Sequence, residues 1–543
     1  MEGQLVDLHQ RSIYPARLDL NSEGFITAIT PLDETSTEAL PYIMPGFVDA
    51  HVHIESSMLT PQHFGALVLP HGTVAVVTDP HEIGNVLGVE GVRFMVSDAR
   101  HTPLRCCFCI PSCVPATPLD RAGAVISPAD VAEMAASGQF YALSEMMNVP
   151  GVLQHDPEVW AKLNAVKQHG LPIDGHAPLL QGEALAQYAA AGISTCHESM
   201  TLEEGREKIA LGMHILIREG SAARNYAALH TLLDESPERI MFCTDDAHPD
   251  DIMERGHIDK HVRQAISDGH DLFDVLRAAS LNPINHYRLP LGQLRKGDKA
   301  DFIVVENLTT FPVLATYIAG RAVYTEAHGL AQAVEQPTTL PNNFDLAPVT
   351  PAQLRRSVGK APMPTIGLIP NELVTDCYTY TPKIASDNLE ADLEDDVLKI
   401  VYVNRYGGGT PQVAYIHGFG LKSGAIASSI GHDSHNIVAV GCTDEAIAAA
   451  INGVIEHCGA LAVVDTDGTC HALPLPIAGI MSDQSAPVVA KAYQGLSALA
   501  QTLGTPLKAP FMTLAFMSLV VIPRMKIGEQ GLFDSEAWDW VEP

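Results

Sequence analysis

The most constraining feature of this sequence is a repeat of short β-branched runs that end in polar residues and alternate with stretches of helical spacing. This alternation is typical of βα units that build a parallel sheet. Eight runs follow one another within about 240 residues, which is the usual length of a closed (β/α)₈ TIM-like barrel. They cover residues 43–53, 73–82, 105–112, 140–147, 171–178, 193–199, 214–221 and 239–246.

Two connecting segments support helices between these strands. Residues 157–170 and 182–192 place apolar side chains at helical intervals and finish in glycine. Glycine is the residue that most often ends a helix in the left-handed conformation. We therefore expect strand, helix and strand to succeed one another along the barrel.

The chain is too long for one hydrophobic core, because its 543 residues exceed the size at which cores stop growing. We predict an α/β protein with a barrel at 45–285. A small flanking β-sandwich domain is expected from two separate segments, 1–44 and 286–334. A linker rich in Pro, Thr and Asn (335–350) then leads to a C-terminal α/β or α+β domain at 351–543.

Charge and composition exclude several classes of function. The net charge of −31 disfavours nucleic acid as a partner. No basic region followed by an apolar run and a cleavage site is seen at the start, so we expect a cytoplasmic protein. The longest apolar stretch, 509–523, is too short to span a membrane, and we expect it to be a buried strand or helix.

Ten cysteines occur, four of them within residues 105–115, but no paired C-x₂-C motif with a distant match is present. A metal knuckle is therefore disfavoured. We interpret these cysteines as small apolar residues of a buried strand in a reducing compartment.

His51 and His53 are the first candidates for chemistry. On a strand, side chains two residues apart point to the same face, so both imidazoles can converge on one cation. Alone, the pair is equally consistent with a metal site and with two buried core histidines. Its position on the first of eight runs favours a ligand role, because barrels of this type build their sites at the carboxyl ends of the strands.

Later runs end in further residues of the ligand type: Glu145, His176, His197 and Asp245. Six nitrogen and oxygen donors suit two divalent ions, with Mn²⁺, Fe²⁺ or Zn²⁺ as candidates. Glu145 can bridge two ions through its two oxygens. Asp246 competes with Asp245 for the position at the eighth strand, and the sequence separates them poorly.

A metal pair of this kind lowers the pKa of bound water, so hydrolysis is the natural reaction. Asp245 can ligate a metal and carry a proton to the leaving group. The second run ends in Asp79-Pro-His81-Glu82, where Glu82 is a candidate proton carrier and His81 is ambiguous.

The motifs PGFVDAHVHIESSM, LPHGTVAVVTDPHEIGNVLG, LSEMMNVPGVL, DGHAP, STCHE, MFCTDDAHPDDI and LGQLRKGDKADFIVV closely resemble the bacterial adenine deaminases of the amidohydrolase superfamily. The resemblance extends over nearly the whole chain, including HGFGLKSGAIASSIGHDSHNIVAVG near the C-terminus. It is much more specific than the paired histidines, which many amidohydrolases share.

The resemblance implies hydrolytic deamination of adenine to hypoxanthine and ammonia with two Mn²⁺ or Fe²⁺ ions. It implies the following metal ligands: His51, His53, His176, His197, the bridging Glu145, and Asp245, which would also shuttle protons. Glu82 would take a proton from the hydroxide and deliver it to the ring nitrogen beside the attacked carbon. Many relatives bridge their metals with a carboxylated lysine, and Glu145 in this position agrees with the adenine deaminase branch.

Residues that bind the base are less defined by the sequence. Ser56, Ser57, Arg218 and Ser221 lie at strand ends and are candidates. The glycine-rich block at 417–436 is either a turn between strands or, as a hypothesis, a segment whose Asp433 and His435 touch the base or close the site.

Three alternatives stay open at this point. A different amidohydrolase acting on another aminopurine or a cyclic amide would use the same metals. A one-zinc deaminase would need H-x-E and P-C-x-x-C; His53-Ile-Glu55 matches the first half, but the second half is missing. A non-catalytic scaffold would have lost ligands, whereas all are present here. We also expect a homo-oligomer and no membrane partner.

Overall fold

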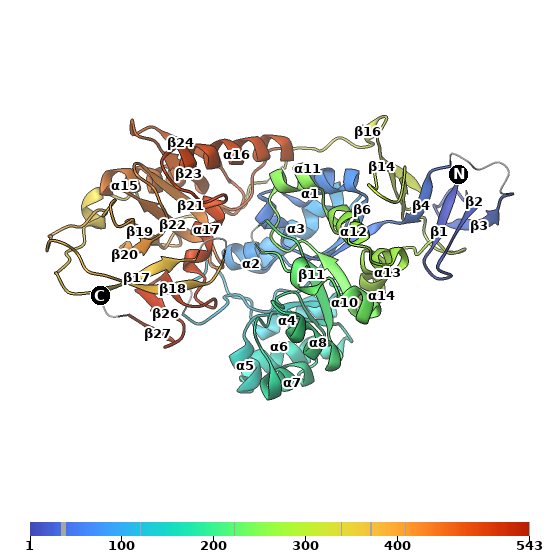
Figure 1. The fold of residues 1–543 in the computed structure, drawn as a ribbon, viewed down its shortest axis with the longest axis horizontal. Coiled ribbons are helices and arrows are strands. Elements are labelled where there is room, and N and C mark those ends of the chain that lie inside the picture. The colour runs from blue at the N-terminus through green and yellow to red at the C-terminus, as the bar shows by residue number, and fades with distance from the viewer. Residues whose placement is uncertain are drawn as a thin grey trace. The chain divides into compact units, whose positions relative to one another are not determined.

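The computed structural model describes residues 1–33, 40–119, 121–221, 223–337, 339–369, 372–407 and 409–541. Its chain divides into two compact units (Figure 1). The first unit consists of residues 1–81, 95–113 and 127–336, and the second of residues 82–94, 114–126 and 337–543.

A ring of parallel strands forms the centre of the first unit. The strands are β5 (Phe47–Val52), β6 (Thr73–Thr78), β7 (Arg105–Phe108), β8 (Leu143–Met146), β9 (Ile173–Gly175), β10 (Thr195–Cys196), β11 (His214–Arg218) and β12 (Ile240–Cys243). Adjacent strands pair in parallel as β5–β6–β7, β8–β9 and β10–β11–β12. Each of the eight predicted runs contains one of these strands.

Backbone hydrogen bonds link the three sets of strands into a closed barrel. A parallel bridge joins Ile110 to Leu143, and Ser194 N–H donates to the Ile173 carbonyl at 2.9 Å. The ring closes at Asp245, whose N–H donates to the His51 carbonyl at 2.9 Å. The barrel predicted from the sequence is thereby confirmed.

Helices follow the strands, as the spacing predicts. They are α1 (Pro61–Val68), α2 (His81–Leu87), α3 (Val89–Asp98), α4 (Pro128–Ala136), α5 (Val149–Leu153), α6 (Pro157–Gln168), α7 (Gly182–Ala190), α8 (Leu202–Ala210), α9 (Tyr226–Leu229), α10 (Leu232–Glu235), α11 (Pro249–Arg255), α12 (Ile258–Ser267), α13 (Leu272–Ala278) and α14 (Leu281–Tyr287). The glycines expected to end two of them, Gly170 and Gly192, have positive φ angles of 65° and 91°. Short 3₁₀ turns lie at Ile54–Ser57, Leu69–His71, Ala99–His101 and Pro237–Arg239.

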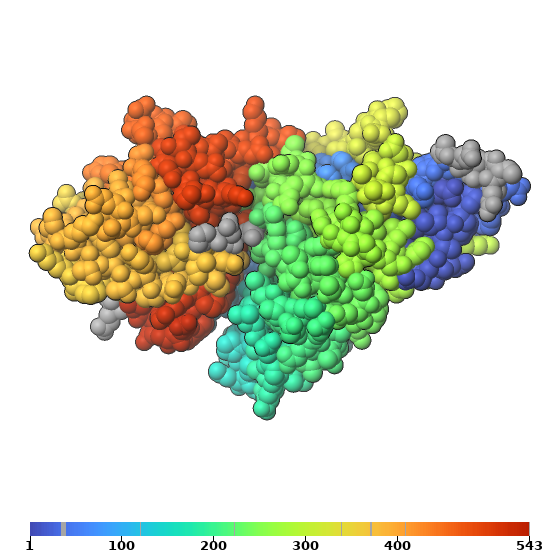
Figure 2. All heavy atoms as spheres, viewed as in Figure 1, coloured from blue at the N-terminus to red at the C-terminus, as the bar shows by residue number. Residues whose placement is uncertain are grey.

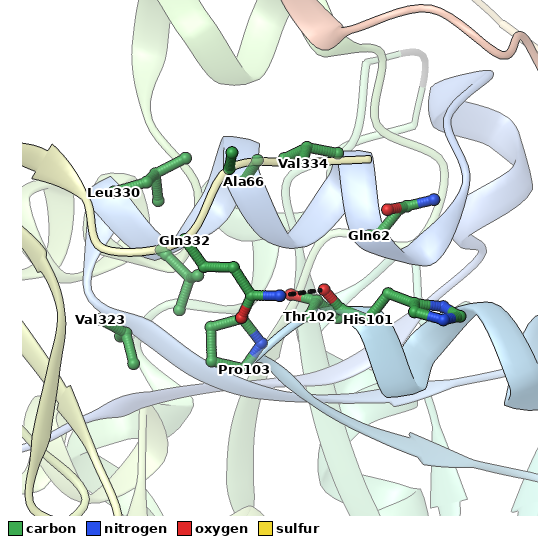
Figure 3. Close-up of a pocket in the computed structure, with 11 residues that line it drawn as sticks. Gln62, Ala66, His101, Thr102, Pro103, Val323, Leu330, Gln332 and Val334 are labelled. Atoms are coloured by element: carbon green, nitrogen blue, oxygen red, sulfur yellow. Dashed lines mark hydrogen bonds between the residues drawn. The ribbon is translucent and has the colours of Figure 1, made fainter. Parts of the chain in front are cut away.

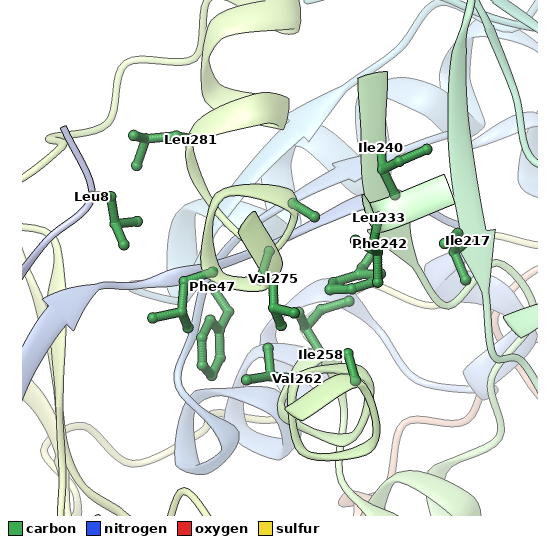
Figure 4. Close-up of a cluster of buried hydrophobic side chains, with 14 of the residues drawn as sticks. Leu8, Phe47, Ile217, Leu233, Ile240, Phe242, Ile258, Val262, Val275 and Leu281 are labelled. Atoms are coloured by element: carbon green, nitrogen blue, oxygen red, sulfur yellow. The ribbon is translucent and has the colours of Figure 1, made fainter. Parts of the chain in front are cut away.

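One hydrophobic core holds the barrel strands against their outer helices. Figure 4 shows Phe47 of β5 and Phe242 of β12 directed toward Val262 of α12 and Val275 of α13. All four side chains are fully buried. Removing this much apolar surface from water is the main force that keeps the barrel closed.

A second sheet of the first unit is built from the segments that precede and follow the barrel in the chain. Its strands are, in spatial order, β16 (Gly329–Leu330), β15 (Arg321–Thr325), β14 (Val313–Ile318), β13 (Phe302–Val305), β4 (Tyr42–Pro45), β1 (Glu2–Asp7), β2 (Ser12–Leu20) and β3 (Ile26–Pro31). The predicted run 43–53 is therefore divided between two sheets. Its first part, β4, pairs with β13, and β5 begins the barrel after Gly46.

The second unit is built on a mixed, mostly antiparallel sheet, which identifies it as α+β. Its order is β18 (Thr375–Tyr380), β17 (Met363–Leu368), β20 (Gln412–His417), β19 (Val397–Val403), β22 (Asn436–Gly441), β21 (Ala425–Gly431), β23 (Ala460–Val464) and β24 (Cys470–Pro474). Three further strands pair separately: β25 (Met525–Gly528), β26 (Gly531–Asp534) and β27 (Asp539–Trp540). The other elements are α15 (Asp444–Glu456), α16 (Ala486–Thr502), α17 (Pro510–Ala515) and 3₁₀ turns at Pro351–Leu354 and Phe516–Ser518.

Side chains of α15 pack on this sheet and share one hydrophobic cluster with β19, β21 and β23. The orange and red residues of these elements form a continuous mass in Figure 2. The apolar stretch 509–523 is buried over most of its length and contains α17, as expected. Within the described part of the chain, no helix has the length and apolar character needed to cross a bilayer.

The cysteine-rich stretch is a barrel strand with its following loop. Cys107 and Cys109 are buried, and burial raises the pKa of the Cys107 thiol to about 12. These thiols are free, and no metal-binding cluster among the described residues includes a cysteine. The burial of Cys107, Cys109 and Cys113 agrees with the interpretation as small apolar packing residues.

Gly46 provides a test of the junction between the two sheets. A Cβ at this position would meet both Cγ atoms of Val74, with Cγ2 at 2.6 Å. We expect Gly46→Ala to lower the free energy of unfolding by about 1–3 kcal/mol, because a packed β-branched side chain must move. The measurement is urea denaturation followed by circular dichroism.

The matched control is Gly495→Ala in α16, where a Cβ would have nothing within 4 Å. It should raise stability by about 0.5–1 kcal/mol, since alanine loses less conformational freedom in a helix. Equal effects of the two substitutions would contradict the close approach at Gly46.

Candidate metal centre

The sequence-predicted ligands all lie at or just beyond the carboxyl ends of barrel strands. His51 is in β5 and Glu145 is in β8; His53, His176, His197 and Asp245 follow β5, β9, β10 and β12. Parallel strands in a closed barrel bring these ends together at one rim. The structure accordingly gathers residues that are up to 194 positions apart in the chain.

Glu145 lies between two groups of histidines. Its Oε2 atom is 2.8 Å from His176 Nδ1 and 3.1 Å from His197 Nε2. Its Oε1 atom is 3.5 Å from His53 Nε2. Each carboxylate oxygen thus faces a different part of the site, which is the arrangement a bridging ligand needs.

Asp245 faces the first histidine pair. Its Oδ1 atom is 3.1 Å from His53 Nε2 and 3.4 Å from His51 Nε2. Its Oδ2 atom accepts a hydrogen bond from Arg218 Nη1 at 2.5 Å. The residue has a positive φ of 56°, a conformation that is uncommon outside glycine and is found where a site holds its backbone in place.

The charged groups of the site favour the binding of a cation. Burial disfavours the charged form of His53, but the Asp245 hydrogen bond and the Glu145 charge raise its pKa well above the usual value. Burial also opposes ionisation of Glu145, yet His176 and His197 hold its pKa well below the usual range. Despite its burial, Asp245 has its pKa lowered mainly by Arg218. Ionised carboxylates in a buried site attract cations.

The donor set fits divalent transition metals. Potential ligand atoms of His51, His53 and Asp245 lie within 4.8 Å of one another, as do those of His51, Glu145 and His197. His51 Nε2 is buried and has no hydrogen-bond partner among the described residues. Imidazole nitrogens together with carboxylate oxygens suit Mn²⁺, Fe²⁺ or Zn²⁺.

A contact at the Nδ1 atom of His53 fixes the orientation of its ring. Its Nδ1 atom lies 3.2 Å from the Asp79 carbonyl oxygen, to which a ring N–H can donate. That contact leaves Nε2 facing the carboxylates and the candidate metal position, as second hydrogen bonds to metal-ligating histidines commonly do.

Glu198, Asp79 and His81 lie near the centre but were not predicted as ligands. Glu198 Oε1 is 3.3 Å from His197 Nε2, and Arg218 forms an ion pair with Glu198. Strand alternation would turn Glu198 away from His197, but β10 ends at Cys196, so the alternation does not apply. Asp79 Oδ2 lies 2.8 Å from His81 Nδ1, and both residues belong to a potential ligand group with His53 and Glu145.

Buried contacts of Asp49 connect the first and last strands of the barrel. Asp49 Oδ1 accepts the backbone N–H groups of His51 (3.2 Å) and Thr244 (3.1 Å). Asp49 Oδ2 is 3.0 Å from His257 Nε2, and neither side chain is exposed. This contact holds β5 and β12 in register where the barrel closes.

The predicted base-binding residues of the barrel make the following contacts. Ser56 Oγ donates to Asp246 at 2.5 Å, so Asp246 is engaged there while Asp245 faces the histidines. Ser57 Oγ donates to the Ile54 carbonyl at 2.6 Å. Ser221 Oγ accepts a backbone N–H bond at 2.9 Å.

Glu82, Asp433 and His435 belong to the second unit. Glu82 is in the first turn of α2, where the helix dipole favours a carboxylate. His435 lies in the buried turn between β21 and β22, and its Nε2 is 3.9 Å from Glu82 Oε2. Tyr406 anchors the turn by donating to the Ser434 carbonyl at 2.6 Å.

A cavity elsewhere in the first unit is too small for a base. It has about 20 Å³ of space and is lined by Gln62, His101 and Val323, with Gln332 donating to the His101 carbonyl (Figure 3). Ligand pockets usually enclose about 300–1,000 Å³. This cavity has room for about one water molecule.

Two family models match the chain. The "Amidohydrolase family" model covers residues 42–323, and the "Adenine deaminase C-terminal domain" model covers residues 372–539.

Curated relatives are similar over the full length. An "Adenine deaminase" of Salinibacter ruber is 48% identical, and the match covers 99% of this chain and 98% of the relative. An "Adenine deaminase" of Methanosarcina barkeri is 47% identical over 100% of this chain and 98% of that protein. The crystal structure of N-acetyl-D-glucosamine-6-phosphate deacetylase from Mycobacterium smegmatis gives a TM-score of 0.45 at 16% identity, covering 59% of this chain and 98% of that one.

The cluster of donors predicts stabilisation by divalent cations. We expect Mn²⁺ added to metal-free protein to raise the unfolding temperature, since each ion contributes about 2.7 kcal/mol at a concentration 100 times its Kd. His53→Asn should remove most of this increase, as measured by calorimetry. The control is His155→Asn on an exposed loop, which should keep the full increase; a similar loss in both variants would argue against the site.

Proposed function

This chain belongs to the adenine deaminases of the amidohydrolase family, and from that membership we propose how its own residues catalyse the reaction. The enzyme hydrolyses adenine to hypoxanthine and ammonia: a C–O bond forms at C6 of the purine, and the C–N bond to the amino group breaks. The observation that carries the proposal is the convergence of four imidazoles and two carboxylates at one rim of the barrel.

We propose that His51, His53 and Asp245 hold one divalent ion and that His176 and His197 hold the other. Glu145 would contact both, since its oxygens face the two groups separately. The resemblance favours Mn²⁺ or Fe²⁺, and the donors also accommodate Zn²⁺. Once bound, such ions supply Lewis acidity and lower the pKa of water toward neutrality.

Asp245 is proposed to move protons at its carboxylate. Its lowered pKa keeps it ionised near neutral pH, so it can accept a proton from the attacking water. The ammonia leaving group then takes that proton. Arg218, paired with Asp245 and Glu198, holds the carboxylate in place during these steps.

Glu82 is proposed to take the second proton of the attacking water and deliver it to the purine ring nitrogen beside C6, while Asp245 carries the first to ammonia. Carbon C6 of an aromatic purine resists attack until that nitrogen is protonated, so an acid at this point contributes as much as the nucleophile. Glu82 follows His81 directly, and His81 shares a potential ligand group with Glu145.

The C-terminal turn is proposed to assist Glu82 and the base. His435 lies 3.9 Å from Glu82 within the second unit, which supports a role for the turn beyond connecting two strands. Asp433 is in the same buried turn. Ser56, Ser57, Arg218 and Ser221 of the barrel stay predictions as base-binding residues.

We further propose that the enzyme is cytoplasmic and forms a homo-oligomer. The location is supported by ten cysteines that are all free thiols, as is usual in a reducing compartment. Sedimentation of the purified protein would establish its assembly.

The function is tested by turnover of purified protein loaded with Mn²⁺. Ammonia should be released from adenine and not, at a comparable rate, from adenosine or guanine, and hydantoin should not undergo ring opening. Ring opening of hydantoin, or release of ammonia from guanine, with adenine unchanged, would favour a different amidohydrolase.

The proton-carrier role predicts that Glu82→Gln lowers kcat by about 10²–10⁴-fold while two Mn²⁺ remain bound. The control is Glu90→Gln, which alters an exposed carboxylate also in the first turn of a helix and should leave kcat unchanged. His435→Ala should lower kcat to a smaller extent. If both Glu82→Gln and His435→Ala kept full turnover, neither role would survive.

A further inference from the structure

A buried ion pair lies beside the metal centre without belonging to its ligand set. Lys208 Nζ is 2.7 Å from Glu204 Oε1, and the two side chains in α8 are 0% and 1% exposed. Burying two charges costs free energy that their mutual attraction recovers only when further hydrogen bonds satisfy both groups. The partners that complete this pair indicate its purpose.

Glu204 binds two loops that carry proposed metal ligands. Its Oε1 accepts the N–H of Leu179 at 2.9 Å, three residues after His176. Its Oε2 accepts the N–H of Met200 at 2.9 Å, three residues after His197. One carboxylate therefore fixes the distance between the backbones that follow both histidines.

Lys208 makes a second connection between the same loops. Its Nζ donates to the carbonyl of Ala177 at 2.8 Å, next to His176. It also donates to Ser199 Oγ at 3.2 Å, two residues after His197. The ion pair thus connects the ends of β9 and β10 through both of its members.

Helix capping alone does not account for these contacts. Thr201 caps α8 by accepting the Glu204 N–H at 3.2 Å, and a carboxylate at this position often binds the backbone just before a helix. Such a cap explains the bond to Met200. It does not explain the bonds to Leu179 and Ala177, which lie 25 and 31 residues away from their partners.

Leu179 gives independent support for a positioning role. Its φ is +59°, in the left-handed region that a leucine rarely adopts. The residue is 68% exposed, so its side chain contributes little packing to hold this conformation. The Glu204 carboxylate accepts the Leu179 N–H at 2.9 Å and so contacts the backbone at this position of the loop after His176.

We propose that the Glu204–Lys208 pair positions His176 and His197, so that binding of the ion held by these two histidines depends on it. This inference rests on the proposed function, which assigns the two histidines to one ion. The ion held by His51, His53 and Asp245 has its own support in Asp49 and His257, and should not depend on the pair.

The test counts bound Mn²⁺ in metal-free protein by following the free Mn²⁺ signal in electron paramagnetic resonance. Glu204→Leu combined with Lys208→Met replaces both charges by apolar groups of similar size, a change that buried pairs often tolerate. We expect one Mn²⁺ to bind with wild-type affinity and the second to bind about 10–100-fold more weakly. Glu204→Gln, a milder change, should weaken the same ion less.

The matched control is the buried Lys399–Asp444 pair of the second unit, at 0% and 3% exposure. Asp444→Leu combined with Lys399→Met should leave both Mn²⁺ affinities unchanged. The inference is overturned if the Glu204 variants bind two Mn²⁺ with wild-type affinity, or if both ions weaken equally. Wild-type protein that binds no Mn²⁺ would instead overturn the proposed function, and this inference with it.

Discussion

The hydrogen bonds that close the barrel are the interaction on which the rest of the site depends. Asp245 N–H donates to the His51 carbonyl, and His53 N–H donates to the Asp245 carbonyl at 3.2 Å. The residues that close the ring are therefore the same residues whose side chains face one another across it. If the seam slipped by one residue, alternation would turn His51 and His53 away from Asp245 together.

The side chains around this seam carry many buried charges. Arg218 is buried and pairs with both Asp245 and Glu198, which leaves the site with an excess of carboxylates over fixed cations. The raised pKa of His53 reflects the neighbouring carboxylates, whereas the pKa of Glu145 is lowered by the imidazoles of His176 and His197. Divalent ions bound there would supply positive charge to these carboxylates.

The sequence predicted the barrel and the gathering of its six donors, because strand periodicity and the position of polar residues at strand ends are local signals. It did not predict Glu198, since the alternation rule applies only within a strand and β10 is two residues long. Asp49 is visible in the sequence, but its partner His257 is 208 positions away, and no periodicity connects them. The predicted boundary at 44/45 lies close to the division of run 43–53 at Gly46, although the run itself was expected to be one strand.

The proposed ligands divide according to the strands that carry them. His51, His53 and Asp245 come from neighbouring strands at the seam, and His176 and His197 come from neighbouring strands β9 and β10. Glu145 is on β8, which pairs with β9, and its carboxylate reaches toward both groups. Each group also has its own buried support, His257 beside Asp49 for the first and the Lys208–Glu204 ion pair for the second. The two supports share no residue, and Glu145 is the proposed ligand that faces both groups.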